Sequence, residues 1–393
     1  MKKINILYLH AGAELYGADK VLLSLISNIN KNKFFPIVVL PNDGPLVEEI
    51  KKKGVDVYIE DYPILRRKFF NLKGIFAYPF QYMRSYIKLS KYIRKFEIDL
   101  VHVNTTAVLQ GIFIKIFLKK KIVWHIHEIL ENPHFLFKLT SFFIGKYADD
   151  VVVVSKAVKN HLISSKLIKE SKVSVVYNGV DNTIYNSNHD INYLYDEFGL
   201  SKNNIVIGMV GRVNSWKGQE HFLQAISSIL KKNSDVYGIL VGGVFDNESY
   251  RMENLKNQIA DLNISQQVIV EDFRNDIPAI YDLFDIFVLP STNPDPLPTV
   301  VLEAMASGKP VIGYNHGGVT EMVENGYNGF LCEVNNVKDL EQKIDFLISN
   351  EKVRKEMANN SSTRQKKYFS LESYINNFEK LYSSRCYKVE KNE

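Results

Sequence analysis

The feature that most constrains the fold is the repeated alternation of short β-branched runs with longer stretches of helical periodicity. Alternation of this kind implies parallel sheets that are covered by helices on both faces. The chain is therefore expected to belong to the α/β class. The runs that indicate buried strands are Ile4–Leu9, Phe35–Leu40, Val55–Ile59, Leu100–Val103, Ile122–His125, Val151–Ser155, Ile205–Val210, Gly238–Gly242, Val268–Val270, Ile286–Leu289 and Pro310–Tyr314.

A polar and irregular stretch near residues 182–200 interrupts the alternation. A chain of 393 residues is long enough for two domains. The expected architecture is two doubly wound Rossmann-like domains that face each other across a cleft. Residues 1–190 would form the first domain and residues 191–370 the second. Ligands of such domains bind beyond the carboxyl ends of the strands.

Charge is distributed unevenly along the chain. Residues 1–190 hold 28 Lys and Arg against 17 Asp and Glu, a net charge of +11, whereas the remainder holds 21 against 27, a net charge of −6. A basic first domain predicts an anionic partner. Only Cys332 and Cys386 occur, and no apolar run reaches the roughly 18 residues that span a bilayer. We therefore expect a cytoplasmic protein that is not integral to a membrane.

The stretch from Leu289 to Gly318 carries the strongest chemical signal. Asp295 stands in a proline-rich loop, and Glu303 follows eight residues later within an apolar helical run. The run opens at Leu297-Pro298-Thr299, where proline suits the first turn of a helix. Helix N-termini present unpaired N–H groups, so this stretch predicts an anion-binding turn. Two carboxylates beside it can accept hydrogen bonds from sugar hydroxyls.

A second signal lies in Gly208–Gly218, where a strand ends in a glycine-flanked turn that carries Arg212 and Lys217. Glycine allows close approach of the backbone to an anion, and the two cations supply charge. A nucleotide diphosphate that leaves during bond cleavage develops negative charge, which fixed cations stabilise without a divalent metal. The sequence has no Asp-x-Asp, His-Glu-x-x-His or Cys-x-x-Cys motif. We therefore expect no metal cofactor.

Two features of the first half complete the candidate site. The loop Ala11–Asp19 follows the first expected strand and contains Gly17, which suits a phosphate or acceptor site. Alternation along Ile122–His125 and beyond sends His125 and His127 to the same face of the sheet. Either histidine can be the functional one on this pattern alone.

The motifs together resemble those of the retaining family 4 glycosyltransferases, which have the GT-B fold. Glu303-Ala304-Met305-Ala306-Ser307-Gly308-Lys309-Pro310-Val311 is similar to the family signature Glu-Ala-Met-Ala-x-Gly-x-Pro-Val. The family also has a Gly-Arg pair followed by a Lys-Gly pair, which Gly211-Arg212 and Lys217-Gly218 resemble. It commonly has a His-Glu pair, which His127-Glu128 resembles. Two positions depart from the pattern: Asp295 replaces the first glutamate, and Leu297-Pro298 replaces a Phe-Gly pair.

This resemblance implies the transfer of a sugar from a nucleotide-diphosphate donor to a hydroxyl of a lipid-linked or glycan acceptor. The transfer would be retaining and independent of metal, and it would serve cell-surface polysaccharide synthesis. It also implies that residues 371–393 pack back on the first domain. The implied catalytic residues are His127, Arg212, Lys217 and Asp295. The implied donor-binding residues are Gly17, Gly211, Arg212, Lys217, Asp295, Leu297, Thr299, Val300 and Glu303. His127 is preferred to His125 because it forms the family's His-Glu pair.

Two other functions fit the same cleft: a nucleotide-sugar epimerase, and an inactive membrane-bound scaffold in which the departures at Asp295 and Pro298 abolish transfer. The epimerase would need several further acid and base residues. Slow release of a nucleotide diphosphate from a nucleotide-sugar donor would indicate a transferase, because neither the epimerase nor the scaffold would release it.

The segment Arg66–Lys95 mixes basic residues with Phe, Tyr, Ile and Met. It suits a helix on an anionic membrane surface, which would make the protein peripheral on the inner face of the plasma membrane. The alternative is a helix that packs its apolar face on its own domain. Pro79 is expected to break or kink this helix. No nucleic-acid-binding motif accompanies the segment, so no nucleic-acid partner is expected.

Overall fold

The computed structural model describes residues 2–65, 72–245 and 248–386. The chain forms two compact units, Met1–Asn178 with Glu372–Glu393, and Gly179–Leu371. Residues 179–190 therefore group with the second unit, although the expected boundary lies at residue 190. Hydrogen bonds explain this grouping, because Val180 N–H donates to the Phe369 carbonyl at 3.1 Å and His189 Nδ1 lies 2.7 Å from an Asp282 carboxylate oxygen.

The first unit contains a fully parallel seven-stranded sheet in the order β3-β2-β1-β4-β5-β6-β7. Its β-branched runs are buried on both faces, as a parallel sheet requires. The strands are β1 (Ile4–His10), β2 (Phe34–Leu40), β3 (Asp56–Ile59), β4 (Leu100–Asn104), β5 (Lys121–Ile126), β6 (Asp150–Val153) and β7 (Val173–Val175).

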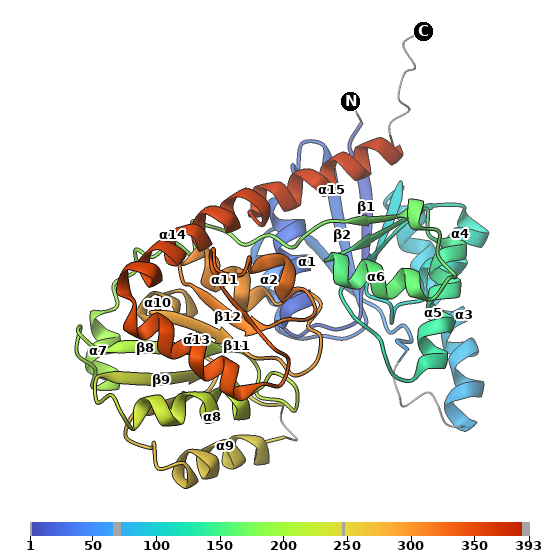
Figure 1. Cartoon of the computed structure of the whole chain (residues 1–393). Coiled ribbons are helices and arrows are strands. Elements are labelled where there is room, and N and C mark those ends of the chain that lie inside the picture. Colours follow the sequence, from blue (N-terminus) through green and yellow to red (C-terminus); the bar gives the residue numbers. More distant parts are fainter. Residues whose placement is uncertain (1, 66–71, 246–247, 387–393) are drawn as a thin grey trace. The chain divides into compact units, whose positions relative to one another are not determined.

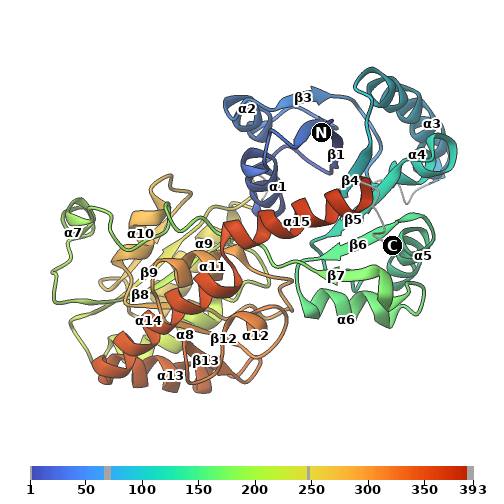
Figure 2. The same ribbon diagram turned by 90° about the horizontal axis from the view of Figure 1, so that it is seen from above.

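Helices cover both faces of this sheet (Figure 2). Gly111 of α4 lies against Val103 and Trp124, where a Cβ would approach their side chains to 3.0 and 3.4 Å. The alternate residues of the same strands, His102 and His125, face α15 (Leu371–Cys386) instead. The helices are α1 (Gly17–Asn28) and α2 (Pro45–Lys52) on the side of α15, and α3 (Leu72–Lys95), α4 (Gly111–Leu118), α5 (His134–Tyr147) and α6 (Lys156–Ser164) on the other.

The helix α15 (Leu371–Cys386) completes the core of the first unit and lies beside β1 and β2 in Figure 1. The Tyr382 hydroxyl is 2.7 Å from His102 Nδ1, and the Phe378 ring centroid is 4.9 Å from that of His125. At the end of the helix, the Arg385 guanidinium pairs with the Asp150 carboxylate. The part of the tail after Cys386 lies outside the described residues.

The second unit contains a parallel six-stranded sheet in the order β10-β9-β8-β11-β12-β13. Helices α10, α11 and α14 lie above this sheet in Figure 1, and α8 and α9 lie below it. The strands are β8 (Ile205–Val210), β9 (Val236–Val241), β10 (Val268–Glu271), β11 (Ile286–Leu289), β12 (Val311–Tyr314) and β13 (Gly329–Cys332). The helices are α7 (Asn192–Phe198), α8 (Gln219–Leu230), α9 (Tyr250–Asp261), α10 (Ile277–Leu283), α11 (Thr299–Ala306), α12 (Val319–Met322), α13 (Val337–Ser349) and α14 (Glu351–Tyr368).

The expectation of an α/β fold with two parallel, helix-covered sheets is confirmed. Strands β7 and β13 were not expected, because β7 has only three residues and β13 begins at a glycine and is buried only at its two end residues. Pro79 was expected to break or kink its helix; the break is wrong, since α3 continues through Pro79 to Lys95. Pro79 is exposed, so water can replace the one helical hydrogen bond that a proline removes. Within the described residues, no helix combines the length and apolarity that a bilayer crossing requires.

The two histidines beneath α15 predict a dependence of stability on pH. Burial lowers the pKa of His102 to about 3 and holds the pKa of His125 well below its usual value of about 6.5. Below that usual value the unfolded chain binds protons that the folded chain does not. The free energy of unfolding should therefore fall as pH drops from about 6.5, by up to about 1.4 kcal/mol per pH unit for each histidine.

Urea unfolding at neutral and mildly acidic pH measures this effect. His125→Phe should lessen the pH dependence, because both ring nitrogens of His125 are buried without a hydrogen-bond partner and an apolar ring fits the same surroundings. His134→Phe on the exposed surface of α5 is the matched control and should leave the dependence unchanged. An unaltered dependence in His125→Phe would show that burial of this imidazole does not set it.

Candidate active site

The polar residues of the first unit gather where β1, β4 and β5 end side by side. The chain winds from β1 to β2 in one direction and returns to β4 on the other side of β1. Ligands of doubly wound sheets bind at such a reversal, because the loops on its two sides diverge there. His10 ends β1, Asn104 ends β4 and His127 directly follows β5. The candidate histidine therefore lies at the expected edge of the sheet.

A chain of hydrogen bonds connects these residues. Asp19 Oδ1 lies 2.6 Å from His10 Nε2, Asn104 Nδ2 lies 2.9 Å from His10 Nδ1, and Asn104 Oδ1 lies 2.8 Å from His127 Nε2. An amide oxygen only accepts, so Nε2 of His127 carries a proton. Desolvation, followed by the nearby His10 and His102, lowers the pKa of His127 well below its usual value. The neutral ring thus has Nδ1 as its acceptor.

His125 occupies a different environment, although its ring centroid is only 4.0 Å from that of His127. It is fully buried, and it packs against Phe378 of α15. His127 is partly exposed at the sheet edge. Of the two histidines, only His127 is therefore placed where a ligand can reach it.

Gly17 is the exposed first residue of α1. A Cβ at this position would meet nothing within 4 Å, so the chain's own packing does not require glycine there. The neighbouring Asp19 accepts a hydrogen bond from the Tyr16 backbone N–H at 2.8 Å and thereby holds the first turn of α1. This turn follows the carboxyl end of β1 and lies at the same edge as His127.

The second unit has its own reversal, between β8 and β11. Gly211 directly follows β8, and the loop that continues through Trp216 lies against the loop after β11. Thr292 N–H donates to the Trp216 carbonyl at 2.7 Å. Gly218 has φ +84, and a Cβ there would come within 1.9 Å of the Pro290 carbonyl oxygen. Glycine at 218 is therefore what permits the two loops to meet.

The two candidate cations lie on this loop. The Lys217 ammonium pairs with the Asp295 carboxylate, and both side chains are largely buried. The Arg212 guanidinium lies over the Phe245 ring, 4.0 Å from its centroid. The sequence assigned Lys217 and Asp295 to different parts of a ligand, whereas the structure brings them into direct contact. In this arrangement each neutralises the other.

Asp295 is also fixed through its backbone, because Gly318 N–H donates to its carbonyl at 2.7 Å. Leu297 is buried, and Pro298 directly precedes α11. Thr299 and Val300 are partly exposed in the first turn of that helix. These positions therefore present the N-terminus of α11 beside Asp295.

Glu303 lies one turn further along α11. Its side chain is buried and its Oε2 accepts a hydrogen bond from the Tyr281 hydroxyl at 2.9 Å. Burial, followed by the charge of Glu303, holds the pKa of Tyr281 well above its usual value, so the phenol remains a donor. Tyr281 thus fixes the carboxylate that the sequence predicted to bind the donor.

Comparisons with known proteins agree with this geometry. Residues 16–206 match the family described as Glycosyltransferase Family 4, and residues 194–364 match Glycosyl transferases group 1. The chain is 30% identical over 335 residues, 83% of this chain and 85% of the relative, to an uncharacterized glycosyltransferase of Methanocaldococcus jannaschii. The chain belongs to the family 4 glycosyltransferases.

Two further comparisons extend over nearly the whole chain. It is 26% identical over 394 residues to the UDP-Gal:alpha-D-GlcNAc-diphosphoundecaprenol alpha-1,3-galactosyltransferase of Escherichia coli, with 97% of each chain covered. The structure of Anabaena Alr3699/HepE in complex with UDP and glucose superposes with a TM-score of 0.84 at 27% identity, covering 97% of this chain and all of that one. The GT-B fold and the assignment as a glycosyltransferase are therefore confirmed.

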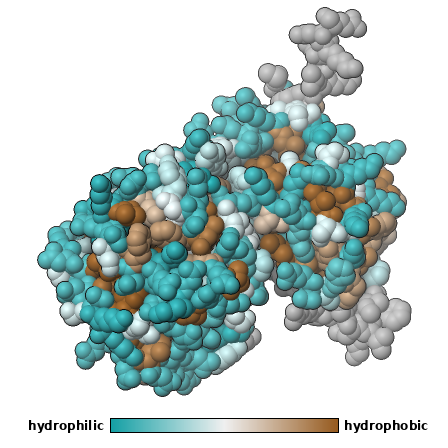
Figure 3. Space-filling view, in the orientation of Figure 1, coloured by the Kyte–Doolittle hydropathy of each residue, from teal (hydrophilic) through white to brown (hydrophobic). Residues whose placement is uncertain are grey.

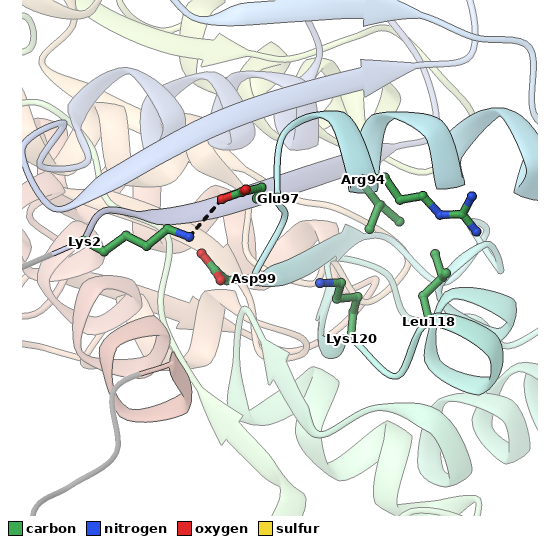
Figure 4. A pocket seen from close by; sticks show the side chains of 7 residues that line it. Lys2, Arg94, Glu97, Asp99, Leu118 and Lys120 are labelled. Atoms are coloured by element: carbon green, nitrogen blue, oxygen red, sulfur yellow. Dashed lines mark hydrogen bonds and ion pairs between the residues drawn. The ribbon is translucent and has the colours of Figure 1, made fainter.

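One hollow on the surface of the first unit lies away from the reversal at β1 and β4. This hollow of about 490 Å³ is lined by Lys2, Glu97 and Asp99, among others, and lies near the amino ends of β1 and β4. Figure 4 shows Lys2 extended toward Glu97, with which it pairs at 2.9 Å. Five of the seven lining residues are charged, and the hollow lies at the opposite edge of the sheet from His127.

His10, Asp19, Asn104 and Tyr281 lie in the candidate site but were not predicted from the sequence. Asn104 had a usable signal, because a polar residue that directly follows an apolar strand lies at the ligand-binding edge of a parallel sheet. His10 has the same signal. Tyr281 lies outside the motifs, and Asp19 ends the Ala11–Asp19 loop but reaches the site through His10, so only the tertiary structure identifies their contacts.

Asn104 predicts a coupled effect on glycosyl transfer. Asn104→Ala removes the hydrogen bond that orients His127, so kcat/KM should fall about tenfold, as expected for one lost hydrogen bond. The same substitution in a His127→Ala background should have little further effect. Steady-state kinetics of the four proteins measure this coupling. Asn28→Ala, an exposed asparagine of α1, is the control. Fully additive losses would disprove the link between Asn104 and His127.

Proposed function

We propose that this glycosyltransferase moves a sugar from a uridine diphosphate donor to a hydroxyl of a lipid-diphosphate-linked saccharide, with retention and without a metal ion. The observation that carries the proposal is the placement of Arg212, Lys217 and Asp295 at the reversal of the second sheet. The donor class is supported by the UDP complex of the Anabaena structure and the acceptor class by the name of the Escherichia coli relative. Such a reaction belongs to cell-surface polysaccharide synthesis in the cytoplasm.

The proposed donor site uses the loop after β8 and the N-terminus of α11. Arg212 and Lys217 would bind the diphosphate and stabilise the charge that develops as the leaving group departs. Lys217 would exchange its contact with Asp295 for a phosphate oxygen, which frees the Asp295 carboxylate for sugar hydroxyls. Glu303, held by Tyr281, would accept hydrogen bonds from the ribose. Binding of the donor and breaking of the ion pair are therefore one event.

The proposed chemistry is attack from the face that the diphosphate leaves. The bond between the anomeric carbon and the phosphate oxygen breaks as the acceptor oxygen bonds to the same face of that carbon. The acceptor proton passes to the departing phosphate oxygen. His127 would accept a hydrogen bond from a sugar hydroxyl at Nδ1. An α-1,3 linkage in the product of the Escherichia coli relative agrees with retention, because UDP-galactose is itself an α-glycoside.

The two cations predict large kinetic effects. Arg212→Ala and Lys217→Ala should each lower kcat by about two to three orders of magnitude, as for other groups that stabilise charge in a transition state. Release of UDP from a panel of UDP-sugars measures this effect and distinguishes a transferase from an inactive scaffold. Lys256→Ala on the exposed surface of α9 is the control. EDTA should leave the rate unchanged. A rate that requires added Mg²⁺ or Mn²⁺ would contradict the metal-free proposal.

The ion pair predicts a change in donor selectivity. Asp295→Asn removes the carboxylate from the sugar and releases Lys217 from its partner, so the ratio of kcat/KM values among UDP-sugars should change. Glu303→Gln is the matched carboxylate-to-amide control at the proposed ribose contact, and it should raise KM equally for all UDP-sugars. If Asp295→Asn leaves the donor profile intact, Asp295 does not contact the sugar.

A further inference from the structure

The helices α3, α4 and α5 carry a concentration of exposed apolar side chains. These helices comprise 46 residues, yet they hold eight of the 21 large apolar side chains that are exposed in the described chain. Figure 3 shows hydrophobic side chains at the surface on this side of the first unit. The eight residues are Phe80, Met83, Ile87, Ile116, Phe117, Phe135, Leu139 and Phe142. We call the surface that they form the α3–α5 face.

The spacing of these residues makes the face continuous. Phe80, Met83 and Ile87 are separated by three and four residues, and so are the members of the α5 group, so each set lies on one side of its helix. The helix α4 packs against both α3 and α5. The Phe117 ring centroid of α4 is 5.5 Å from that of Tyr86 of α3. Each helix buries its opposite side, and the eight apolar side chains of this side remain exposed.

The charge of the three helices is of one sign. They contain nine Lys and Arg residues, six in α3, one in α4 and two in α5, and no Asp or Glu. Lys88 pairs with Glu60 at 2.6 Å and Lys115 with Asp149 at 2.7 Å, so these two are engaged within the unit. Arg84 and Lys91 are exposed and lie on the same side of α3 as Phe80 and Ile87. Cations therefore border the apolar side chains directly.

We propose that the α3–α5 face binds the surface of an anionic lipid membrane. Aromatic and aliphatic side chains would enter the boundary between headgroups and acyl chains, and the basic side chains would contact the phosphates. The sequence predicted such a surface for Arg66–Lys95; the structure extends it over three helices, while residues 66–71 lie outside the described residues. An anionic bilayer fits this face better than an acidic protein, because a bilayer accepts apolar side chains from three helices at once and presents phosphates to the basic side chains beside them.

The position of the face relates it to the site in the first unit. Each of the three helices follows the carboxyl end of a strand, so its first turns lie toward the edge that holds His127. Phe135 stands in the first turn of α5. A membrane at the Phe135 end of this face would hold a lipid-linked acceptor close to that edge, whereas Ile116 and Phe117 stand at the opposite end, in the last turn of α4. This last step rests on the proposed function, whereas membrane binding itself does not.

Flotation with vesicles tests the proposal in the absence of donor. The protein should bind phosphatidylglycerol-containing vesicles more strongly than pure phosphatidylcholine vesicles. Binding should weaken at high salt, because the Debye length shrinks from about 10 Å at about 0.1 M to about 3 Å at about 1 M. Arg84→Glu with Lys91→Glu should weaken partitioning by at least about 25-fold, because the loss of each basic side chain alone removes about a fivefold factor and the new carboxylates are repelled.

The control variants make the same changes of charge and of apolarity on the surface of the second unit. Lys256→Glu with Lys366→Glu alters the net charge equally on the second unit and should leave binding intact. Phe80→Ser with Phe117→Ser should weaken binding, whereas Tyr250→Ser with Phe346→Ser should not. Equal binding of both charge variants, equal binding to neutral vesicles, or a dimer that depends on Phe80 and Phe117 would each overturn the proposal.

Hydrolysis of UDP-sugars separates this proposal from the proposed function. The variants of the α3–α5 face should release UDP at the wild-type rate, because none of the changed residues belongs to the site. Loss of vesicle binding with intact hydrolysis supports the membrane surface alone. Vesicle binding without any donor hydrolysis supports the surface but contradicts the proposed transfer reaction.

Discussion

The sites of this glycosyltransferase depend on the reversal of winding direction in each of its two sheets. Right-handed crossovers place α1 and α2 on one face of the first sheet, and the return to β4 places α3, α4 and α5 on the other. The loops after β1 and β4 diverge as a result, and the edge between them is accessible to ligands. The same geometry holds for β8 and β11 in the second sheet. The polar residues that can bind a ligand or take part in catalysis lie at these two positions, because the topology leaves room for a ligand there.

The ion pair at the reversal of the second sheet suits a site whose contacts change when a ligand binds. Lys217 and Asp295 are buried together, and a buried charge that loses its partner is costly. A phosphate group would pair with the Lys217 ammonium, and sugar hydroxyls would donate to the Asp295 carboxylate. These contacts together would replace the lost ion pair. The proposed site therefore favours a ligand with both groups over free diphosphate or free sugar. In the first unit, the neutral His127 and the hydrogen-bonded Asn104 form a site without net charge of their own.

Much of the fold could be predicted from the sequence, because parallel strands that are buried on both faces are recognisable as apolar runs. Val173–Val175 has only three residues and Gly329–Cys332 begins at a glycine, so neither was recognised as a strand. Each forms as an edge strand because its neighbouring strand supplies hydrogen bonds. The region around Asp295 and Glu303 could be predicted from its motif. The pairing of Lys217 with Asp295 could not, because it joins two loops that are 78 residues apart. The same holds for Tyr281 and Glu303, and for Asp19 and Asn104 on either side of His10.

The proposed mechanism requires that the diphosphate leaves, and the acceptor oxygen attacks, on the same face of the anomeric carbon. Proton NMR of the sugar that is first released from a UDP-α-sugar tests this requirement most directly. The anomeric proton reports the configuration of the product before it equilibrates in water. The account predicts that the α-anomer appears first and the β-anomer only later. Initial release of the β-anomer would show inversion and would contradict the proposed mechanism.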